Sequence, residues 1–118
     1  MSATTKIPQD QLADYFDAFT RRFLTEGASE SIDVEVIEPE LGDQRPVEGV
    51  RLQGVTYERE TNTLEFELDS GDHRVYGPEE VWTVEDDDGF VSAIEVVKSD
   101  ASKEIISIRR ADTRQSRG

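Results

Sequence analysis

Asp72 and His73 form the only adjacent carboxylate–imidazole pair in the sequence, because His73 is its single histidine. An imidazole acts as a general base near neutral pH when an acidic group orients its ring. Neighbouring side chains of a strand point to opposite faces of the sheet, so Asp72 is poorly placed to hold the ring of His73. Two interpretations stay open: a weak catalytic pair of Asp72 and His73, or a histidine at a strand end that makes a local hydrogen bond.

Residue types that the sequence lacks restrict the other chemistry. It contains no cysteine, which excludes disulfides, thiolate nucleophiles and zinc ribbons, and one histidine cannot supply a site that needs two imidazoles. It also has no glycine-rich phosphate loop, no nucleophile-elbow serine motif and no His-Glu-x-x-His motif. We therefore expect neither a metal nor a cofactor.

The acidic run at residues 85–88, followed by Gly89, offers the oxygen ligands that calcium prefers. A helical calcium loop places its ligands at alternate positions, whereas these four acids are consecutive. They also lie between two segments with strand patterns. The spacing favours a solvated hairpin turn that attracts cations loosely, and specific cation binding stays open.

Three aromatic residues, Tyr57, Tyr76 and Trp82, have the character of a small pocket lining, since ligand sites are mostly apolar with a few polar groups. Packing between neighbouring strands accounts for the same rings without a ligand. Tyr57 and Trp82 are therefore candidate binding residues, with structural packing as the alternative.

The net charge of −14, from 27 acidic and 13 basic residues, restricts the partners. It repels phosphate backbones and anionic headgroups, so we expect neither nucleic acid nor membrane as a partner. The acids are spread along the chain and few lysines accompany them, a pattern that suggests adaptation to molar salt; an ordinary acidic protein is the alternative. We see no basic–apolar leader and no apolar run of about 18 residues, and predict a cytoplasmic protein.

The first element predicted is a helix that starts around Pro8 and stops before Gly27. Its large apolar residues recur at intervals of three and four, which places them on one face. They are Leu12, Phe16, Phe19 and Phe23. We expect this face to cover the apolar side of a sheet.

After residue 31 the pattern changes to alternation of apolar and polar residues, which indicates strands. Strands are predicted at 32–36, 50–57, 64–68, 74–76 running on to 81–85, 90–97 and 104–109. Their short links favour an antiparallel meander. Residues 39–49 are predicted as a loop or an edge. The expected fold is α+β, one N-terminal helix packed on an antiparallel sheet of about six strands, with one domain at 1–110 and a flexible tail at 111–118.

Segments along nearly the whole domain resemble, in the same order, a small uncharacterised bacterial family, a domain of unknown function. They are residues 7–10, 15–20, 40–44, 52–57, 72–75 with Pro78, and 105–109. Leu12 departs from the pattern, because members often have Trp at this position. The resemblance implies a free-standing domain of one helix and strands, implies no activity, and marks Asp43, Gln44, Asp72 and His73 as residues to test.

Together these observations predict a non-enzymatic binding or interaction module from a salt-adapted bacterium. The alternative is a small hydrolase or isomerase that uses His73. The candidate binding residues are Asp43, Gln44, Tyr57, His73 and Trp82. We expect an unknown protein or small molecule as partner, and a monomer or weak homo-oligomer.

Overall fold

The computed structural model describes residues 3–23, 31–40 and 42–109. These residues form one α-helix preceded by a short 3-10 turn, and eight strands. In chain order the elements are β1 (Ala3–Ile7), the 3-10 turn (Gln9–Gln11), α1 (Leu12–Phe23), β2 (Ser31–Glu38), β3 (Gly42–Glu58), β4 (Thr63–Leu68), β5 (His73–Tyr76), β6 (Pro78–Glu85), β7 (Val91–Lys98) and β8 (Lys103–Arg109). The predicted tail at 111–118 lies outside the described residues.

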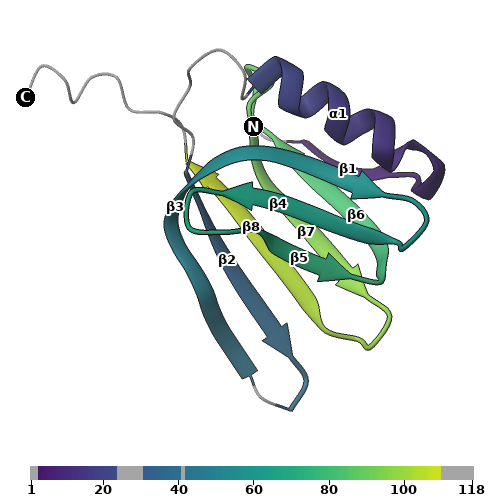
Figure 1. Ribbon diagram of the computed structural model, residues 1–118, viewed down its shortest axis with the longest axis vertical. Helices are drawn as coiled ribbons and strands as arrows, with labels where there is room; N and C mark the ends of the chain where they lie inside the picture. Colours follow the sequence, from purple (N-terminus) through teal and green to yellow (C-terminus); the bar gives the residue numbers. More distant parts are fainter. Residues whose placement is uncertain (1–2, 24–30, 41, 110–118) are drawn as a thin grey trace, which may run out of the picture.

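All eight strands belong to one antiparallel sheet with the order β1-β6-β7-β8-β2-β3-β4-β5. The sheet curls into a half-barrel, with α1 lying at one end of it (Figure 1). One series of hairpins connects β2, β3, β4 and β5, and a second series connects β6, β7 and β8. The two hairpin series are connected by pairing of β8 with β2, which are far apart along the chain.

The predicted fold of one helix on a six-stranded meander is therefore wrong, although the strands are antiparallel as expected. The described residues are mostly strand, and eight strands form their sheet. The sequence did not predict strand β1, because four of its five side chains are exposed and only Ile7 is buried. The strand therefore shows no apolar alternation. The strand order also departs from a meander, because β1 pairs with β6 and β8 pairs with β2.

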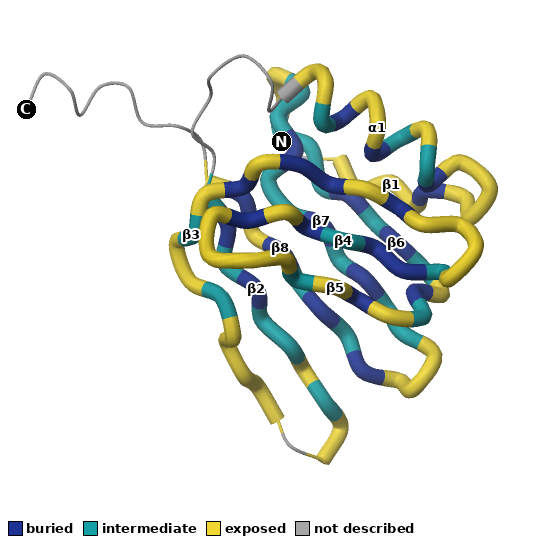
Figure 2. Tube along the Cα trace, in the orientation of Figure 1, coloured by how far each residue is buried: buried dark blue, intermediate teal, exposed yellow. Residues whose placement is uncertain are grey.

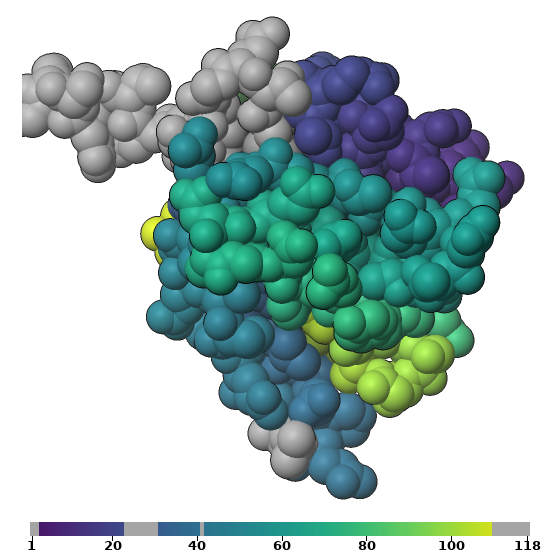
Figure 3. Space-filling model, in the orientation of Figure 1, coloured from purple at the N-terminus to yellow at the C-terminus, as the bar shows by residue number. Residues whose placement is uncertain are grey.

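Strand β3 is 17 residues long and serves both parts of the sheet. Its first part pairs with β2 up to Arg51, and its second part pairs with β4 from Leu52 onward. Within the segment 39–49, predicted as a loop or an edge, residues 42–49 are thus strand; they pair with β2 and precede the part of β3 that pairs with β4. This half of the hairpin is largely exposed and extends beyond the rest of the sheet (Figures 2 and 3). Gly49 has a φ of 64° and donates its N–H to Asp33 at 2.6 Å, which fits a bulge in this strand.

The helix buries the face that its apolar spacing predicts. Leu12, Phe16 and Phe19 are buried and belong to the same core cluster as Phe66 and Val34 of the sheet. The side chain of Phe23, the fourth member, is outside the described part. The Thr20 hydroxyl donates to the Val55 carbonyl and accepts from the Val55 N–H, both at 3.0 Å. The helix thereby provides hydrogen-bond partners for the backbone of β3 beyond the part that pairs with β2.

Alternating residues of the strands fill the concave side of the sheet. On β8, Ile106 and Ile108 are buried while Ser107 and Arg109 are exposed, and the other central strands have similar patterns (Figure 2). The apolar side chains form one core cluster. In the part of the chain that the structure describes, no helix has the length and apolar character needed to cross a membrane.

Candidate functional site

The residues singled out in the sequence do not meet at one place. Asp43 and Gln44 lie on the projecting part of β3, His73 on β5, Tyr57 on the far part of β3 and Trp82 on β6. Two other groupings have the geometry of a site. One surrounds the buried carboxylate of Glu104, and the other is a cleft between α1 and the hairpin of β6 and β7.

His73 is held by Glu104 of β8 and not by its neighbour Asp72. The Nε2 atom of His73 lies 2.8 Å from Oε1 of Glu104, and Nζ of Lys98 donates to Oε2 of the same carboxylate at 3.0 Å. Glu104 is buried, while the side chains of His73 and Lys98 are 19% and 17% exposed. Three strands, β5, β7 and β8, therefore meet through one shared carboxylate.

The charge of Glu104 is stabilised by its two partners. Burial alone would raise the pKa of this carboxyl group, but the hydrogen bonds from His73 and Lys98, with their charges, outweigh burial and lower its pKa below the ordinary value. Glu104 is therefore ionised at neutral pH. Both of its oxygens accept hydrogen bonds, so the cluster ties strands together across the sheet.

The same contact also gives His73 an orienting acid, which is one requirement of a general base. None of the four cavities described for this structure is lined by His73, Lys98 or Glu104. Sequence reasoning missed Glu104, although a signal was present. Glu104 lies two residues before Ile106, at a position of β8 where the alternation expects a buried apolar residue. Lys98 lies two residues after Val96, at the equivalent position of β7.

Asp72 faces away from this cluster. It lies 3.8 Å from Nη2 of Arg74, and its hydrogen bond with Glu65 raises the pKa of Glu65. The structure therefore does not bring the predicted pair of Asp72 and His73 together, for the reason that adjacent positions face opposite sides.

Asp43 and Gln44 contact only neighbours on the hairpin that β2 and β3 form, as far as the described contacts go. A hydrogen bond with Asp43 raises the pKa of Glu35, and the Gln44 amide donates to Glu38 at 3.4 Å. Both residues are exposed. The structure does not bring them near His73 or the aromatic candidates.

Tyr57 and Trp82 are separated as well. Tyr57 is buried, and its hydroxyl donates to Asn62 at 2.6 Å and accepts from Gln9 at 3.2 Å. Trp82 is half-buried on β6, where its indole donates to Glu80 at 3.0 Å and the Lys6 ammonium lies 5.8 Å from its ring. Tyr76 is 65% exposed. These rings pack between strands or face outward and do not line a common pocket.

The acidic run at 85–88 ends β6 and enters a tight hairpin. The Asp86 N–H donates to the Phe90 carbonyl at 2.8 Å, the Gly89 N–H donates to Asp86 at 2.9 Å, and Gly89 has a φ of 87°. This is the predicted hairpin turn, with glycine where positive φ is needed. Among the described residues no group of three or more acidic or histidine side chains is arranged to hold a metal ion.

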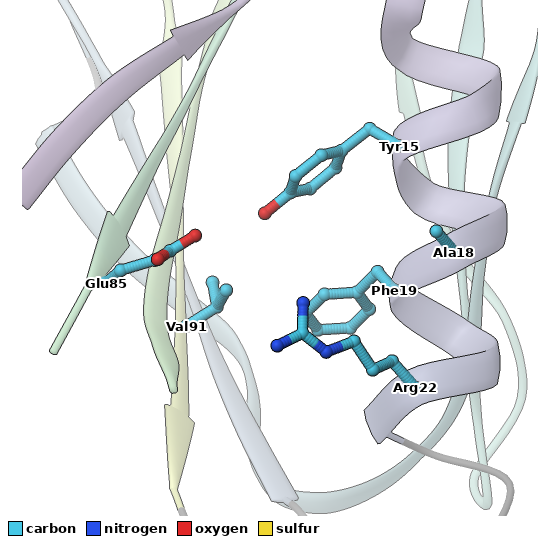
Figure 4. Close-up of a pocket in the computed structure, with 6 residues that line it drawn as sticks. All are labelled: Tyr15, Ala18, Phe19, Arg22, Glu85 and Val91. Atoms are coloured by element: carbon cyan, nitrogen blue, oxygen red, sulfur yellow. The ribbon is translucent and has the colours of Figure 1, made fainter. Parts of the chain in front are cut away.

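A cleft of about 170 Å³ lies between α1 and the hairpin of β6 and β7. Its walls combine apolar and charged side chains from both elements, which extend toward a common space (Figure 4). They are Tyr15, Ala18, Phe19 and Arg22 of the helix, with Glu85 and Val91 of the strands. Sequence analysis placed Phe19 on the apolar face of the helix and did not connect the helix with Glu85.

The phenol of Tyr15 is the polar group in the middle of this cleft. Burial raises its pKa above the ordinary value, a hydrogen bond with Thr83 opposes the rise, and the charges of Glu85 and Arg22 act in opposite directions. The phenol is therefore neutral at physiological pH. The walls of the cleft thus carry a guanidinium group, a carboxylate and a neutral hydroxyl, beside the apolar side chains of Phe19 and Val91.

Comparison with known proteins gives a family but no activity. A family model described as "Family of unknown function (DUF5335)" matches residues 3–117. An uncharacterised protein from Aquifex aeolicus (strain VF5) is 33% identical over 110 residues, which is 92% of this chain and 95% of that protein. No solved structure matches the chain. The resemblance to a small uncharacterised bacterial family is confirmed.

Proposed function

Because the chain belongs to DUF5335, a family of unknown function, we propose a function from its own geometry: it is a non-enzymatic module that binds a small molecule in the cleft between α1 and the β6–β7 hairpin. The observation that carries this proposal is the convergence of Tyr15, Arg22 and Glu85 on one hollow. Ligand sites combine apolar walls with a few polar groups that fix orientation, and this cleft has both.

The cellular setting is part of the proposal. The module works in the cytoplasm of a salt-adapted bacterium, as a monomer or weak homo-oligomer. Its net charge of −14 supports this setting, because such a surface stays soluble in concentrated salt and repels nucleic acid and anionic membranes.

A titration of the 15N-labelled protein with small cations, anions, zwitterions and neutral polyols tests the binding function. We expect one class to shift the backbone amide signals of α1 and of the β6–β7 hairpin in a saturable way. Ala18→Leu should abolish the shifts, because the larger side chain fills the cleft from an exposed helix position, while Ala18→Ser should retain them. Saturable shifts that are confined to other parts of the protein, or that survive Ala18→Leu, would refute the proposed site.

One observation favours a second candidate function, a small hydrolase or isomerase based on His73. The 2.8 Å contact with Glu104 orients the ring as a general base requires. If a panel of ester, amide and isomerisation substrates reveals turnover, His73→Ala should abolish it and Asp43→Ala should leave it unchanged. A His73→Ala variant with full activity would eliminate this candidate.

A further inference from the structure

We propose that the ligand of this cleft is a small zwitterion, whose ammonium group lies beside the Glu85 carboxylate and whose carboxylate is bound by the Arg22 guanidinium. This inference rests on the proposed binding function of the same cleft and adds the chemical class of its ligand. Three features of the cleft support it: its volume, the placement of its charges and its aromatic wall.

The volume restricts the ligand to a few non-hydrogen atoms. At about 170 Å³, the cleft is smaller than the sites of roughly 300–1,000 Å³ that hold drug-sized molecules. A cavity of about 150 Å³ accommodates benzene, so a molecule of about six to eight non-hydrogen atoms fits. Nucleotides, peptides and sugars are therefore too large to be enclosed here.

The two charges lie on opposite walls. Arg22 extends from the last part of α1, and Glu85 stands at the end of β6, with the Tyr15 hydroxyl directed between them (Figure 4). Guanidinium groups bind carboxylates through paired hydrogen bonds, and carboxylates bind ammonium groups. A molecule that carries both charges meets a complementary group at each end.

The aromatic wall favours an ammonium group over a metal cation. The rings of Tyr15 and Phe19 are stacked with centroids 6.5 Å apart, and both residues line the cleft. Ring faces attract ammonium groups, and aromatic rings are the usual partners of quaternary ammonium ligands in proteins. We therefore expect N-methylation of the ligand to strengthen binding.

The charge of the whole protein gives an additional criterion. A net charge of −14 attracts any small cation and repels any small anion through long-range forces that salt screens. A zwitterion has no net charge, so its binding depends on the local pair of Arg22 and Glu85. Its affinity should therefore survive in salt, whereas loose cation association should not.

The experiment measures binding to the full-length protein by amide shifts and calorimetry, at low and at molar potassium chloride. The probes are N,N,N-trimethylglycine, glycine, tetramethylammonium and acetate. We expect trimethylglycine to bind at the cleft at least about tenfold more tightly than either single-charge probe. Tetramethylammonium lacks the carboxylate that accepts charge-assisted hydrogen bonds from Arg22, and acetate lacks the positive charge that Glu85 and the rings attract. Its affinity should change little with salt.

Matched variants locate the two contacts. Arg22→Gln removes charge-assisted hydrogen bonds and Glu85→Gln removes the charge that attracts the quaternary ammonium group, so each should weaken trimethylglycine binding by about tenfold. Arg21→Gln, at a helix position bonded to Asp17 at 2.7 Å, and Glu58→Gln, at the exposed end of β3, should leave it unchanged. Equal effects of the site and control variants would overturn the assignment.

The outcomes separate the ligand class from the binding function. Saturable binding of acetate, tetramethylammonium or a polyol at the cleft without zwitterion binding would overturn this inference and leave the proposed function intact. No saturable binding of any probe at the cleft would overturn both. Zwitterion binding that Ala18→Leu abolishes, and that Ala18→Ser retains, would support both.

Discussion

At the scale of single residues, the Glu104 carboxylate is the most constrained charge described in the protein. It is buried and bonded by His73 and Lys98 from two other strands. Breaking a buried ion pair leaves an uncompensated charge in a poorly solvated place, which costs more than the pair itself contributes. The cluster therefore predicts both a large mutational effect and a defined pH dependence.

Glu104→Gln should lower the free energy of unfolding by about 3 kcal/mol near neutral pH, because it leaves Lys98 without its counter-charge. The pKa of Glu104 is lowered in the folded state, so its contribution is present above the ordinary carboxyl pKa and is lost as pH falls through and below that value. The difference between wild type and variant should thus shrink toward about pH 3 in urea unfolding series. A Glu58→Gln control should show little difference at any pH, and a pH-independent loss for Glu104→Gln would contradict the charge argument.

Ala101 gives a second prediction at this scale. It has a φ of 71° in the turn between β7 and β8, a conformation that costs a residue with a Cβ atom about 1–2 kcal/mol. Ala101→Gly should raise stability by about 0.5–1 kcal/mol, since glycine adopts this conformation without steric cost. The same change at Ala93, inside β7, should lower stability, and thermal melts of both variants check the contrast. A destabilised Ala101→Gly variant would show that the turn is not strained.

At the scale of elements, α1 binds the backbone of β3 in the part of the strand that does not pair with β2. Its Thr20 hydroxyl makes two bonds to the backbone of Val55, one as donor and one as acceptor. This contact fixes how the helix lies on the sheet, and hence where Tyr15 and Arg22 point.

Thr20→Val keeps the shape of the side chain and removes both bonds. It should destabilise the protein by about 2–3 kcal/mol, because two backbone groups of β3 lose their partner. Thr56→Val, at an exposed position on the same strand, serves as the control and should change stability little. Hydrogen exchange at the Val55 amide should accelerate in the Thr20 variant, and unchanged protection there would contradict the proposed role.

The elements also show what could be predicted from the sequence. Local periodicity identified the helix face of Leu12, Phe16 and Phe19 and most strands, because burial on one side leaves a repeating pattern. Exposed strands such as β1 and the first part of β3 leave no such pattern. The Glu104 cluster could not be predicted, because β5 pairs with β4 and reaches β7 and β8 only through side chains, an arrangement that tertiary structure sets.

At the scale of the whole molecule, the acidic surface brings like charges together. Hydrogen bonds between carboxyl groups raise the pKa of Glu35 beside Asp43 and of Glu65 beside Asp72. A raised pKa in the folded state means that stability is present below the ordinary value and declines as these groups ionise. Repulsion between these carboxylates therefore opposes folding at neutral pH.

The melting temperature should rise with potassium chloride from about 0.05 M to about 3 M, because the screening length falls to about 3 Å near 1 M. The rise should be smaller near pH 4.5, where carboxylates begin to protonate. It should also be smaller in the Glu35→Gln/Glu65→Gln double variant, which separates charge repulsion from general effects of salt. A flat or falling melting temperature at neutral pH would refute salt adaptation.

The pairing of β2 with β8 also determines how the chain must fold. Residues 31–37 contact residues 103–109, so the two hairpin series acquire a common core only after β8 has taken its place beside β2. Such contacts between distant segments slow folding into the range of about milliseconds to seconds. During synthesis, β2 to β5 emerge from the ribosome before β8, the strand that pairs with β2, has been made. A chain arrested before residue 103 should therefore remain unfolded and sensitive to proteases, and its exposed strand edge makes it a substrate for chaperones.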